Sequence, residues 1–375
     1  MLPFATSLLL CLPLTLLAQI TLLFEGFEGA FPGANAWGVF EANPNGPHAY
    51  WDDVDSNFGG EGAHTGNWKG YCAGYGYGGS ISAPTYQNDM TAFMEKSIDL
   101  TGFGSATLRF WHKIPGIESG YDQARVYCAG SLVWSNSTVI TNWTEVVLDL
   151  SSFVGTSPTL RFEFYSDYSM TYEGWYLDDI LVTAVQPPAN DSCVDARTLT
   201  DGVLYTMDTT GATSNDGTPG CQVNFGKGVW FKFQSPGDGL VEVSTCGSSF
   251  DTVVEVYSDL CNPMYRMPLA CNDDSGPPCG GNNASVQFNA TANEIYRILA
   301  GGYASACGTL QIVVVPRQRL TIRQNANGTI TVEWPFVGTL QAALSVTGSW
   351  QDLAGAISPY TFMPTGNAMF LRVRQ

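Results

Sequence analysis

The chain has 375 residues, which is enough for two or three domains that each bury their own hydrophobic core. Its 34 acidic residues outnumber 16 Lys and Arg, and the net charge of −18 argues against nucleic acid or an anionic membrane as a partner. Aromatic residues make up 13% of the chain, which argues against disorder and assigns the acidity to a folded surface, where divalent cations are the natural partners.

Residues 1–18 predict a secretory signal peptide that is cleaved near Ala18. The segment carries no charge and is mostly apolar from Leu8 to Ala18, which is too short to cross a bilayer but typical of a signal. Leu10 precedes Cys11 where a lipoprotein signal requires a small residue, so no lipid anchor is expected. No later apolar run reaches about 18 residues, so we expect a protein that is secreted or held at the cell surface without a membrane span.

Residues 19–186 predict an antiparallel β-sandwich of jelly-roll size. Apolar and polar residues alternate over 106–110, 146–150 and 160–164, and no stretch has a convincing helical period. The Gly-rich segment 45–87 is expected to form long loops over the mouth of the sheets, where ligands usually bind. Its aromatic residues either stack on sugar rings or pin these loops to the sheet: Trp51, Trp68, Tyr71, Tyr75 and Tyr77.

The segment Gly174–Val182 predicts a central strand into which two carboxylates are set. Apolar residues occupy both faces, and strand alternation places Asp178 and Asp179 on opposite faces. An ionised carboxylate in apolar surroundings is costly unless it is neutralised or hydrogen-bonded, and no Lys or Arg lies between Arg161 and Arg197. We therefore predict a metal ion as the counter-charge.

Oxygen ligands alone favour Ca²⁺ over Zn²⁺ at this predicted metal site. The other candidate ligands lie far upstream, at Glu25 and Glu28, so a shared ion would join the first and last strands of the domain. The alternative is that Asp178 and Asp179 lie at the end of the strand and accept hydrogen bonds from loop N–H groups.

Catalytic motifs are absent or incomplete. The three His residues, at positions 48, 64 and 112, lack the spacing of a metalloprotease, and no Gly-x-Ser-x-Gly elbow is present. Jelly rolls can host the carboxylate pairs of glycosidases, but metal ligation explains the same residues at least as well. The available pairs are Glu25 with Glu28, Glu118 with Asp122, and Glu173 with Asp178. We expect a non-catalytic protein, with a secreted hydrolase as the alternative.

A linker with Pro187 and Pro188 leads into a Cys-rich block, residues 187–316, that predicts a second β-sandwich. In an exported protein the Cys residues that remain after signal cleavage are best explained by disulfides. The two in the first half can pair with each other, whereas the seven in the second block leave at least one over. The predicted disulfide residues are Cys72 with Cys128, Cys193 with Cys221, and Cys261 with Cys271.

Residues 317–375 predict a short C-terminal β module. Strand-like runs flank Asn327 and Gly328, a pair that is favoured in hairpin turns. A module of this size is marginal as an independent core, so we expect it to pack against the second domain.

The first block carries motifs that resemble a known family. They are Phe27–Gly33, Leu108–His112, Trp143 before Val146–Leu150, and Gly174–Ile180. Together they resemble the MAM-like, concanavalin-A-like jelly rolls of secreted bacterial proteins. The resemblance implies a structural Ca²⁺ held by Glu28 and by Asp178 or Asp179, whereas Glu25 has no firm counterpart.

The second block resembles the bacterial pre-peptidase C-terminal domain. The motifs that carry this resemblance are Asn190–Cys193, Val229–Phe231, Thr245–Thr252, Cys271–Asp274 and Tyr296–Ile298. Such domains accompany secreted peptidases or surface proteins and are not themselves catalytic. The resemblance implies a second Ca²⁺ site at Asp273 and Asp274, where an Asx-rich turn is the alternative.

These expectations combine into one functional hypothesis. The chain is predicted to be a secreted, non-catalytic protein, stabilised by Ca²⁺, that acts in adhesion or in binding a glycan or a surface protein. The alternative is a secreted hydrolase, or an accessory protein of one.

Overall fold

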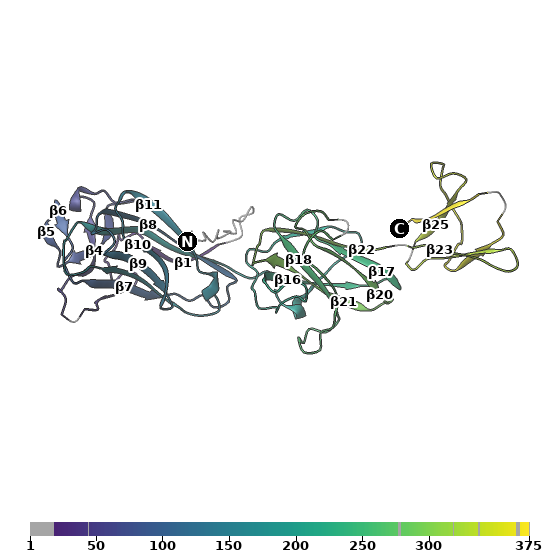
Figure 1. Cartoon of the computed structure of the whole chain (residues 1–375), viewed down its shortest axis with the longest axis horizontal. Helices are drawn as coiled ribbons and strands as arrows, with labels where there is room; N and C mark the ends of the chain where they lie inside the picture. Colours follow the sequence, from purple (N-terminus) through teal and green to yellow (C-terminus); the bar gives the residue numbers. More distant parts are fainter. Residues whose placement is uncertain are drawn as a thin grey trace. The chain divides into compact units, whose positions relative to one another are not determined.

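The computed structural model describes residues 19–43, 45–276, 279–317, 319–336, 338–364 and 368–374, so the predicted signal peptide lies outside the described residues. The described chain is almost entirely β-structure, which confirms the predicted all-β class. Its helical parts are three short 3-10 turns, η1 (Phe58–Gly60), η2 (Ser151–Phe153) and η3 (Cys193–Asp195). Two compact units divide between Pro187 and Pro188 (Figure 1). Within the described residues, no helix is long and apolar enough to cross a membrane.

The first unit contains two main sheets. One has the strand order β11-β8-β13-β4-β3, with β1 paired to β13, and the other has the order β10-β9-β12-β7-β2. The small hairpin β5-β6 completes the unit. The strands are β1 (Ile20–Glu25), β2 (Gly38–Glu41), β3 (Tyr50–Asp55), β4 (Trp68–Tyr75), β5 (Gly78–Ser80), β6 (Ala83–Thr85), β7 (Thr91–Ser97), β8 (Ser105–Gly116), β9 (Gln123–Cys128), β10 (Ser131–Asn136), β11 (Ile140–Asp149), β12 (Thr159–Tyr165) and β13 (Gly174–Val185).

The core of the first unit lies between its two main sheets. Leu108 and Phe110 of β8 are fully buried, as are Phe162 and Phe164 of β12. The rings of Phe110 and Phe162 meet edge to face across the core, with their centroids 5.3 Å apart. Alternating residues of a strand point to opposite faces, so the two-residue period of these segments gives each strand one buried face, as predicted.

Strand β13 is the central strand that its two apolar faces predict. It pairs with β8 on one side and with β4 and β1 on the other, and nearly every side chain along it is buried. Trp175, Tyr176 and Leu177 are consecutive and all fully buried. In a strand with one solvent-exposed face every second side chain would be exposed, so both faces of β13 are covered.

The second unit begins with another β-sandwich. A five-stranded sheet of order β14-β16-β21-β18-β19 faces a four-stranded sheet of order β15-β22-β17-β20. Buried Val, Ile and Phe side chains from both sheets form one core cluster. The strands are β14 (Arg197–Thr198), β15 (Tyr205–Asp208), β16 (Phe225–Gln234), β17 (Gly239–Ser244), β18 (Thr252–Ser258), β19 (Pro268–Asn272), β20 (Ser285–Ala290), β21 (Ile295–Tyr303) and β22 (Thr309–Pro316).

Three disulfides join described residues of this sandwich, and their pairing corrects the prediction. The bonds join Cys193 to Cys261, Cys221 to Cys271, and Cys246 to Cys279. The expected pairs Cys193–Cys221 and Cys261–Cys271 are therefore wrong, although all four residues are bridged. Cys193 of η3 lies next to Cys261 in the loop after β18, and Cys221 lies next to Cys271 of β19. The disulfide partners are therefore decided by the folded arrangement and not by the order of the Cys residues along the chain.

The predicted bridge between Cys72 and Cys128 is also wrong, since both thiols are free and buried. Cys72 belongs to β4 in one sheet and Cys128 to β9 in the other. Stacked sheets lie about 10 Å apart, whereas a disulfide needs Cα atoms within about 7 Å of each other. Burial raises the pKa of the Cys128 thiol to about 11, so it remains protonated.

The C-terminal module consists of two small sheets, of order β23-β24-β27 and β26-β25-β28. Val332, Trp334 and Leu340 form its own small core. Phe336 belongs instead to the core cluster of the second sandwich. Within the described residues, the contact of the module with the second sandwich is made by the segment around Phe336. Its strands are β23 (Thr321–Gln324), β24 (Ile330–Glu333), β25 (Thr339–Ala343), β26 (Gln351–Asp352), β27 (Tyr360–Phe362) and β28 (Phe370–Arg374).

Candidate functional site

The two carboxylates of β13 both reach the loop that precedes β4. The pairing of β13 with β8 shifts register between Asp178 and Leu181, and Asp179 has a φ of 46°, in the left-handed region. This bulge breaks the regular alternation, so the prediction that the two carboxylates point to opposite environments is wrong. Asp178 Oδ2 accepts hydrogen bonds from the N–H groups of His64, at 2.8 Å, and Thr65, at 3.1 Å.

Asp179 and Glu28 hold the same loop through other contacts. Nδ1 of His64 lies 2.6 Å from Oδ2 of Asp179, and the Thr65 hydroxyl donates to Oδ1 at 2.7 Å. Glu28 Oε1 accepts from the N–H of Asn67 at 2.6 Å, and also from the next N–H along the chain at 2.7 Å. Three of the sequence-predicted acids therefore converge on one loop. Asp178 accepts from loop N–H groups as the capping alternative expects, but it lies inside β13 and not at the end of the strand.

Asp178 is fully buried, and this burial sets its protonation. Loss of solvent is the main cause that raises the pKa of its carboxyl, and the charge of Asp179 adds to it. The loop N–H groups oppose both effects, and the resulting pKa is about 7. No Lys or Arg forms an ion pair with Asp178 in the described part of the chain.

The remaining sequence-predicted acids lie elsewhere. Glu25 accepts from the Phe27 N–H at 2.8 Å and from the Asn35 amide and the Trp37 indole at 2.8 and 3.0 Å, so it holds the turn after β1. In the second sandwich, Asp273 accepts from the Gln222 amide at 2.6 Å. The backbone oxygen of Asp274 accepts from the side chain of Asn272 at 3.0 Å, which is a local turn contact.

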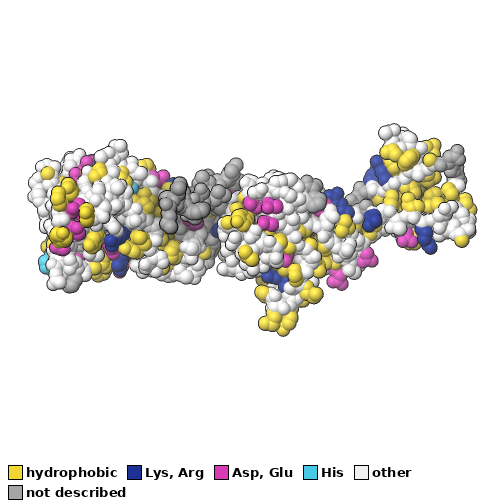
Figure 2. All heavy atoms as spheres, in the orientation of Figure 1, with side chains coloured by type: hydrophobic (Ala, Val, Ile, Leu, Met, Phe, Trp, Pro, Cys, Tyr) yellow, Lys and Arg dark blue, Asp and Glu magenta, His cyan; other side chains and the backbone are white. Residues whose placement is uncertain are grey.

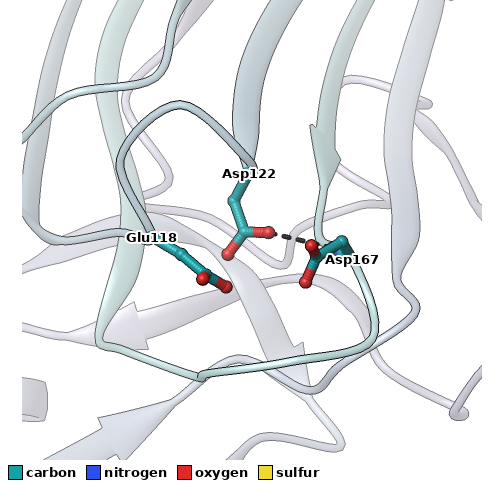
Figure 3. A group of neighbouring side chains, drawn as sticks. All are labelled: Glu118, Asp122 and Asp167. Atoms are coloured by element: carbon teal, nitrogen blue, oxygen red, sulfur yellow. Dashed lines mark hydrogen bonds between the residues drawn. The ribbon is translucent and has the colours of Figure 1, made fainter.

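A second group of acids lies at the end of the first sandwich where the β8–β9 loop meets the segment after β12 (Figure 3). Glu118, Asp122 and Asp167 place carboxylate oxygens within 4.8 Å of one another. Among the described residues, this is the one group of three or more potential metal ligands with this spacing. Asp122 is fully buried and accepts from the Asp167 N–H at 2.9 Å and from the Tyr86 hydroxyl. Burial raises the pKa of the Asp122 carboxyl.

Glycoside hydrolysis requires carboxyl groups that reach the sugar, and the three candidate pairs do not meet this requirement. Asp122 and Asp178 have no exposed surface. Glu25 is buried under the turn that it holds. The arrangement of these acids supports loop anchoring and not acid–base chemistry.

An open cleft of about 480 Å³ lies on the outer face of the sheet β10-β9-β12-β7-β2. Its lining comes from three adjacent strands and the turn after β9: Glu95, Tyr127, Gly130, Thr159, Arg161 and Glu163. In the sheet register, Glu95 pairs with Arg161, and Arg161 pairs with Tyr127, so these three side chains form one row across the strands. Their sequence neighbours Met94, Val126 and Phe162 are buried in the core, which fixes the row on the outer face.

Two ion pairs organise the polar part of this cleft. The Arg161 guanidinium donates from Nε and Nη2 to Glu95 Oε2, at 3.0 and 2.8 Å. Arg125 donates to Glu163 Oε1 at 3.1 Å, and Arg161 Nη1 lies 3.7 Å from the other oxygen of Glu163. The Tyr127 hydroxyl lies 3.5 Å from Glu163, so one connected network crosses three strands.

Aromatic rings lie beneath and beside this network. The guanidinium of Arg161 lies 3.9 Å from the centroid of the Phe93 ring, and that of Arg125 lies 4.8 Å from the Tyr165 ring. Phe40 of β2 is 49% exposed and stacks on Phe93, with the ring centroids 5.2 Å apart. The face therefore combines an accessible aromatic edge with donors and acceptors in fixed positions.

Sequence reasoning placed ligand binding in a different part of the first unit. The expectation that segment 45–87 forms long loops is wrong, because it contains the strands β3, β4, β5 and β6. Trp51 of β3 and Tyr71 of β4 are buried in the core, whereas Trp68 and Tyr75 are exposed. The alternation over 160–164 predicts Arg161 and Glu163 as polar positions of a strand. The sequence does not show which strands are neighbours, and this is why it does not reveal the cleft. The charged side chains of β7, β12 and β9 come together only because these three strands are adjacent in the sheet.

Comparison with known proteins gives short or weak matches. No family model matches the chain. It is 32% identical over 88 residues to Bacillopeptidase F of Bacillus subtilis (strain 168), which covers 21% of this chain and 6% of that protein. It is 28% identical over 111 residues to the Pre-pro-metalloprotease PrtV of Vibrio cholerae, which covers 25% of this chain and 12% of that protein. The chain thus spans about an eighth or less of the curated relatives it matches.

Solved structures that are similar cover from under half to most of the chain. The K1 cleaved adhesin domain of Lys-gingipain from Porphyromonas gingivalis W83 matches with a TM-score of 0.32 and 17% identity, over 44% of this chain and 97% of that one. The tandem CBM22-1-CBM22-2 domains of Xyn10C from Paenibacillus barcinonensis match with a TM-score of 0.32 and 12% identity, over 80% of this chain and 98% of that one. At these scores the matches assign no family to the chain.

Proposed function

We propose that this chain is an extracellular, non-catalytic binding protein whose first domain binds a carbohydrate on the outer face of the sheet β10-β9-β12-β7-β2. The observation that carries the proposal is the cleft, in which an Arg–Glu network lies beside the half-buried ring of Tyr127 and near the exposed ring of Phe40. Sugar hydroxyls are recognised by planar donors and acceptors in fixed positions, and the apolar faces of sugar rings pack on aromatic side chains. Adhesion to a glycan-bearing surface would use the same face.

The ion pairs of the cleft support binding in preference to hydrolysis. Glycosidases need one carboxyl as a proton donor and another as a nucleophile or base. In this cleft Glu95 and Glu163 each form an ion pair with an Arg, which suits a fixed binding surface better than a carboxyl that must donate a proton. A secreted hydrolase, or an accessory protein of a peptidase, is the alternative function, and the sequence matches to two peptidases motivate it.

The three disulfides support export. Disulfides form and persist in oxidising compartments and are uncommon in the cytosol of mesophiles. Two of the disulfides between described residues separate their Cys residues by 68 and 50 positions along the chain. Loops of this length gain substantial stability from closure, in keeping with a protein that works outside the cell.

We propose in addition that Ca²⁺ stabilises the first domain. Carboxylate oxygens are the ligands that Ca²⁺ prefers. Glu118, Asp122 and Asp167 fit this role because their oxygens already lie within 4.8 Å of one another. The sequence-predicted ligands Glu28, Asp178 and Asp179 are chemically suitable, but they already accept hydrogen bonds from the loop before β4.

A binding assay on residues 19–375 tests the carbohydrate proposal. Affinity electrophoresis against a panel of soluble polysaccharides should show retardation in at least one gel. The variant Tyr127→Ala should weaken that retardation, because it removes a side chain that lines the cleft. Arg109→Ala is the matched control, since Arg109 forms an exposed ion pair with Glu145 on the other sheet.

Two results would contradict the proposal. A protein that migrates unretarded through every polysaccharide would not be a glycan-binding protein. Clearing of a polysaccharide or of casein by the purified protein would favour the hydrolase alternative.

A further inference from the structure

We infer that the cleft selects neutral glycans, and that Glu95 sets this selectivity by neutralising Arg161. The inference rests on the proposed carbohydrate-binding function and specifies the ligand class of the same site. It makes Glu95 a residue that determines specificity, and it predicts how a single substitution changes the ligand.

The charges on the sheet face alternate in sign. In one row across the strands Glu95 lies opposite Arg161, and in the next row Glu163 lies opposite Arg125. Each guanidinium thus has a carboxylate as its neighbour on the adjacent strand, at 2.8 Å for Arg161 and 3.1 Å for Arg125. These four side chains carry two positive and two negative charges, so the network has no net charge.

The binding edge of Arg161 is already occupied. Its Nε and Nη2 atoms, which form the fork that matches a carboxylate, both donate to Glu95. A sugar carboxylate would have to displace Glu95 from this edge, which would leave the Glu95 side chain, only 28% exposed, without its cation. The total charge of −18 opposes the approach of an anionic polymer as well.

A neutral sugar can bind without breaking these ion pairs. Arg161 Nη1 lies 3.7 Å from Glu163, beyond hydrogen-bonding distance, so it can still donate to a hydroxyl. The carboxylate oxygens of Glu95 and Glu163 have lone pairs that can accept from hydroxyl groups. The exposed ring of Phe40 and the side chain of Tyr127 offer apolar area to the sugar ring.

An ion pair elsewhere in the first unit provides a control for the effect of freeing an Arg in the cleft. Figure 2 shows basic side chains next to acidic ones on the face of the first unit that is in view. Arg109 and Glu145 form such a pair at 2.9 Å on the sheet that carries β8 and β11, away from the cleft. Freeing Arg109 should therefore not affect a glycan in the cleft.

The test uses residues 19–375 with two probes, soluble xylan as the neutral glycan and polygalacturonate as the anionic one. We expect the unmodified protein to bind xylan or another neutral glycan and to show no affinity for polygalacturonate. The variant Glu95→Gln should gain affinity for polygalacturonate by about tenfold or more, the change expected from one charge-assisted hydrogen bond. This gain should fall as salt is raised.

Two further variants separate the mechanism from a general charge effect. Glu145→Gln changes the net charge by the same amount and should show no gain. The double variant Glu95→Gln/Arg161→Gln should lose the gain, because it removes the cation that Glu95→Gln exposes. Melting temperatures of all variants verify that the fold is retained.

The outcomes distinguish this inference from the proposed function. Binding of polygalacturonate by the unmodified protein as tightly as a neutral glycan overturns the neutral selectivity and leaves carbohydrate binding in place. A folded Glu95→Gln variant with no gain, or a gain equal to that of Glu145→Gln, overturns the role of Glu95. Failure to bind any glycan overturns the proposed function itself.

Discussion

At the scale of single residues, Asp178 shows how this protein uses a buried charge. A carboxyl in the middle of an apolar strand would be costly if it were isolated, yet two loop N–H groups and the N–H of Asp179 surround it. These bonds fix the loop before β4 to the central strand. The side chain is thus an anchor whose strength depends on its protonation.

The raised pKa of Asp178 predicts a pH dependence of stability. Its folded-state pKa of about 7 lies above the usual value of about 3.9 for an unfolded chain, so the folded state binds the proton more tightly. This contribution to stability is complete below about pH 4 and is lost as the pH rises through about 7, with a slope of up to about 1.4 kcal/mol per pH unit. Asp178→Asn, which cannot ionise, should flatten the dependence of unfolding free energy on pH in this window.

Chemical denaturation of the first unit at several pH values measures this effect. Asp99→Asn is the matched control, because Asp99 is an exposed carboxyl of the same unit. An unchanged pH slope in Asp178→Asn would show that this carboxyl does not titrate between folded and unfolded states.

At the scale of elements, loops at the end of the first sandwich are joined by the acidic group Glu118, Asp122 and Asp167. The first two residues lie between β8 and β9, and the third follows β12. The bond from the Asp167 N–H to Asp122 already links these segments, and a divalent cation among the carboxylates would strengthen that link.

Calcium should therefore raise the melting temperature of the first unit. Binding to the folded state alone adds about 2.7 kcal/mol at a Ca²⁺ concentration one hundred times Kd. Calorimetry with Ca²⁺ and with EGTA should show the shift, and Asp122→Asn should abolish it. If Asp178→Asn abolishes the shift instead, the sequence-predicted ligands hold the ion. Superimposed curves would reject calcium binding.

The disulfides predict different responses of the two units to reduction. The three bonds described lie in the second sandwich, whereas Cys72 and Cys128 in the first are free. Each bond contributes about 2 to 4 kcal/mol, so a reductant should lower the melting transition of the second sandwich and leave the first unchanged. Non-reducing peptide mapping provides the direct measurement, and a bridged Cys72–Cys128 peptide would contradict the structure.

At the scale of the whole molecule, the second unit joins a stable sandwich to a module that has few core residues of its own. Phe336 crosses from the module into the core of the sandwich, and its ring and the preceding Pro335 lie against Gly237 and Gly239. A Cβ atom at Gly237 would lie 2.2 Å from the backbone oxygen of Pro335, so a larger residue there would force the two parts away from each other.

Removing this contact should destabilise both parts together. Phe336→Ala should cost about 3 to 5 kcal/mol, the usual range for a buried aromatic ring. We expect a lower melting temperature of the second unit and faster proteolysis after Arg317, next to the module. Ile357→Ala is the matched control, since Ile357 is an exposed residue of the module. Equal effects of the two substitutions would show that Phe336 makes no special contribution.

The sequence alone determined the class of fold and much of the core. The two-residue period of apolar positions fixes the strands and their buried faces, because it depends only on neighbouring residues. The apolar residues on both sides of Asp178 likewise predict that β13 is a central strand of its sheet, because this pattern too depends only on neighbouring residues. The small size of the last 59 residues predicts that the module leans on a neighbour, and Phe336 in the sandwich core is in keeping with this.

The tertiary structure decided everything that depends on which strands are adjacent. Disulfide partners, the convergence of Glu28, Asp178 and Asp179 on one loop, and the cleft all join residues that are distant in sequence. Local periodicity carries no information about strand order or about a bulge such as that at Asp179, since both arise when separate segments pack. Glu95, Arg161 and Tyr127 became a candidate binding site only when β7, β12 and β9 paired in register.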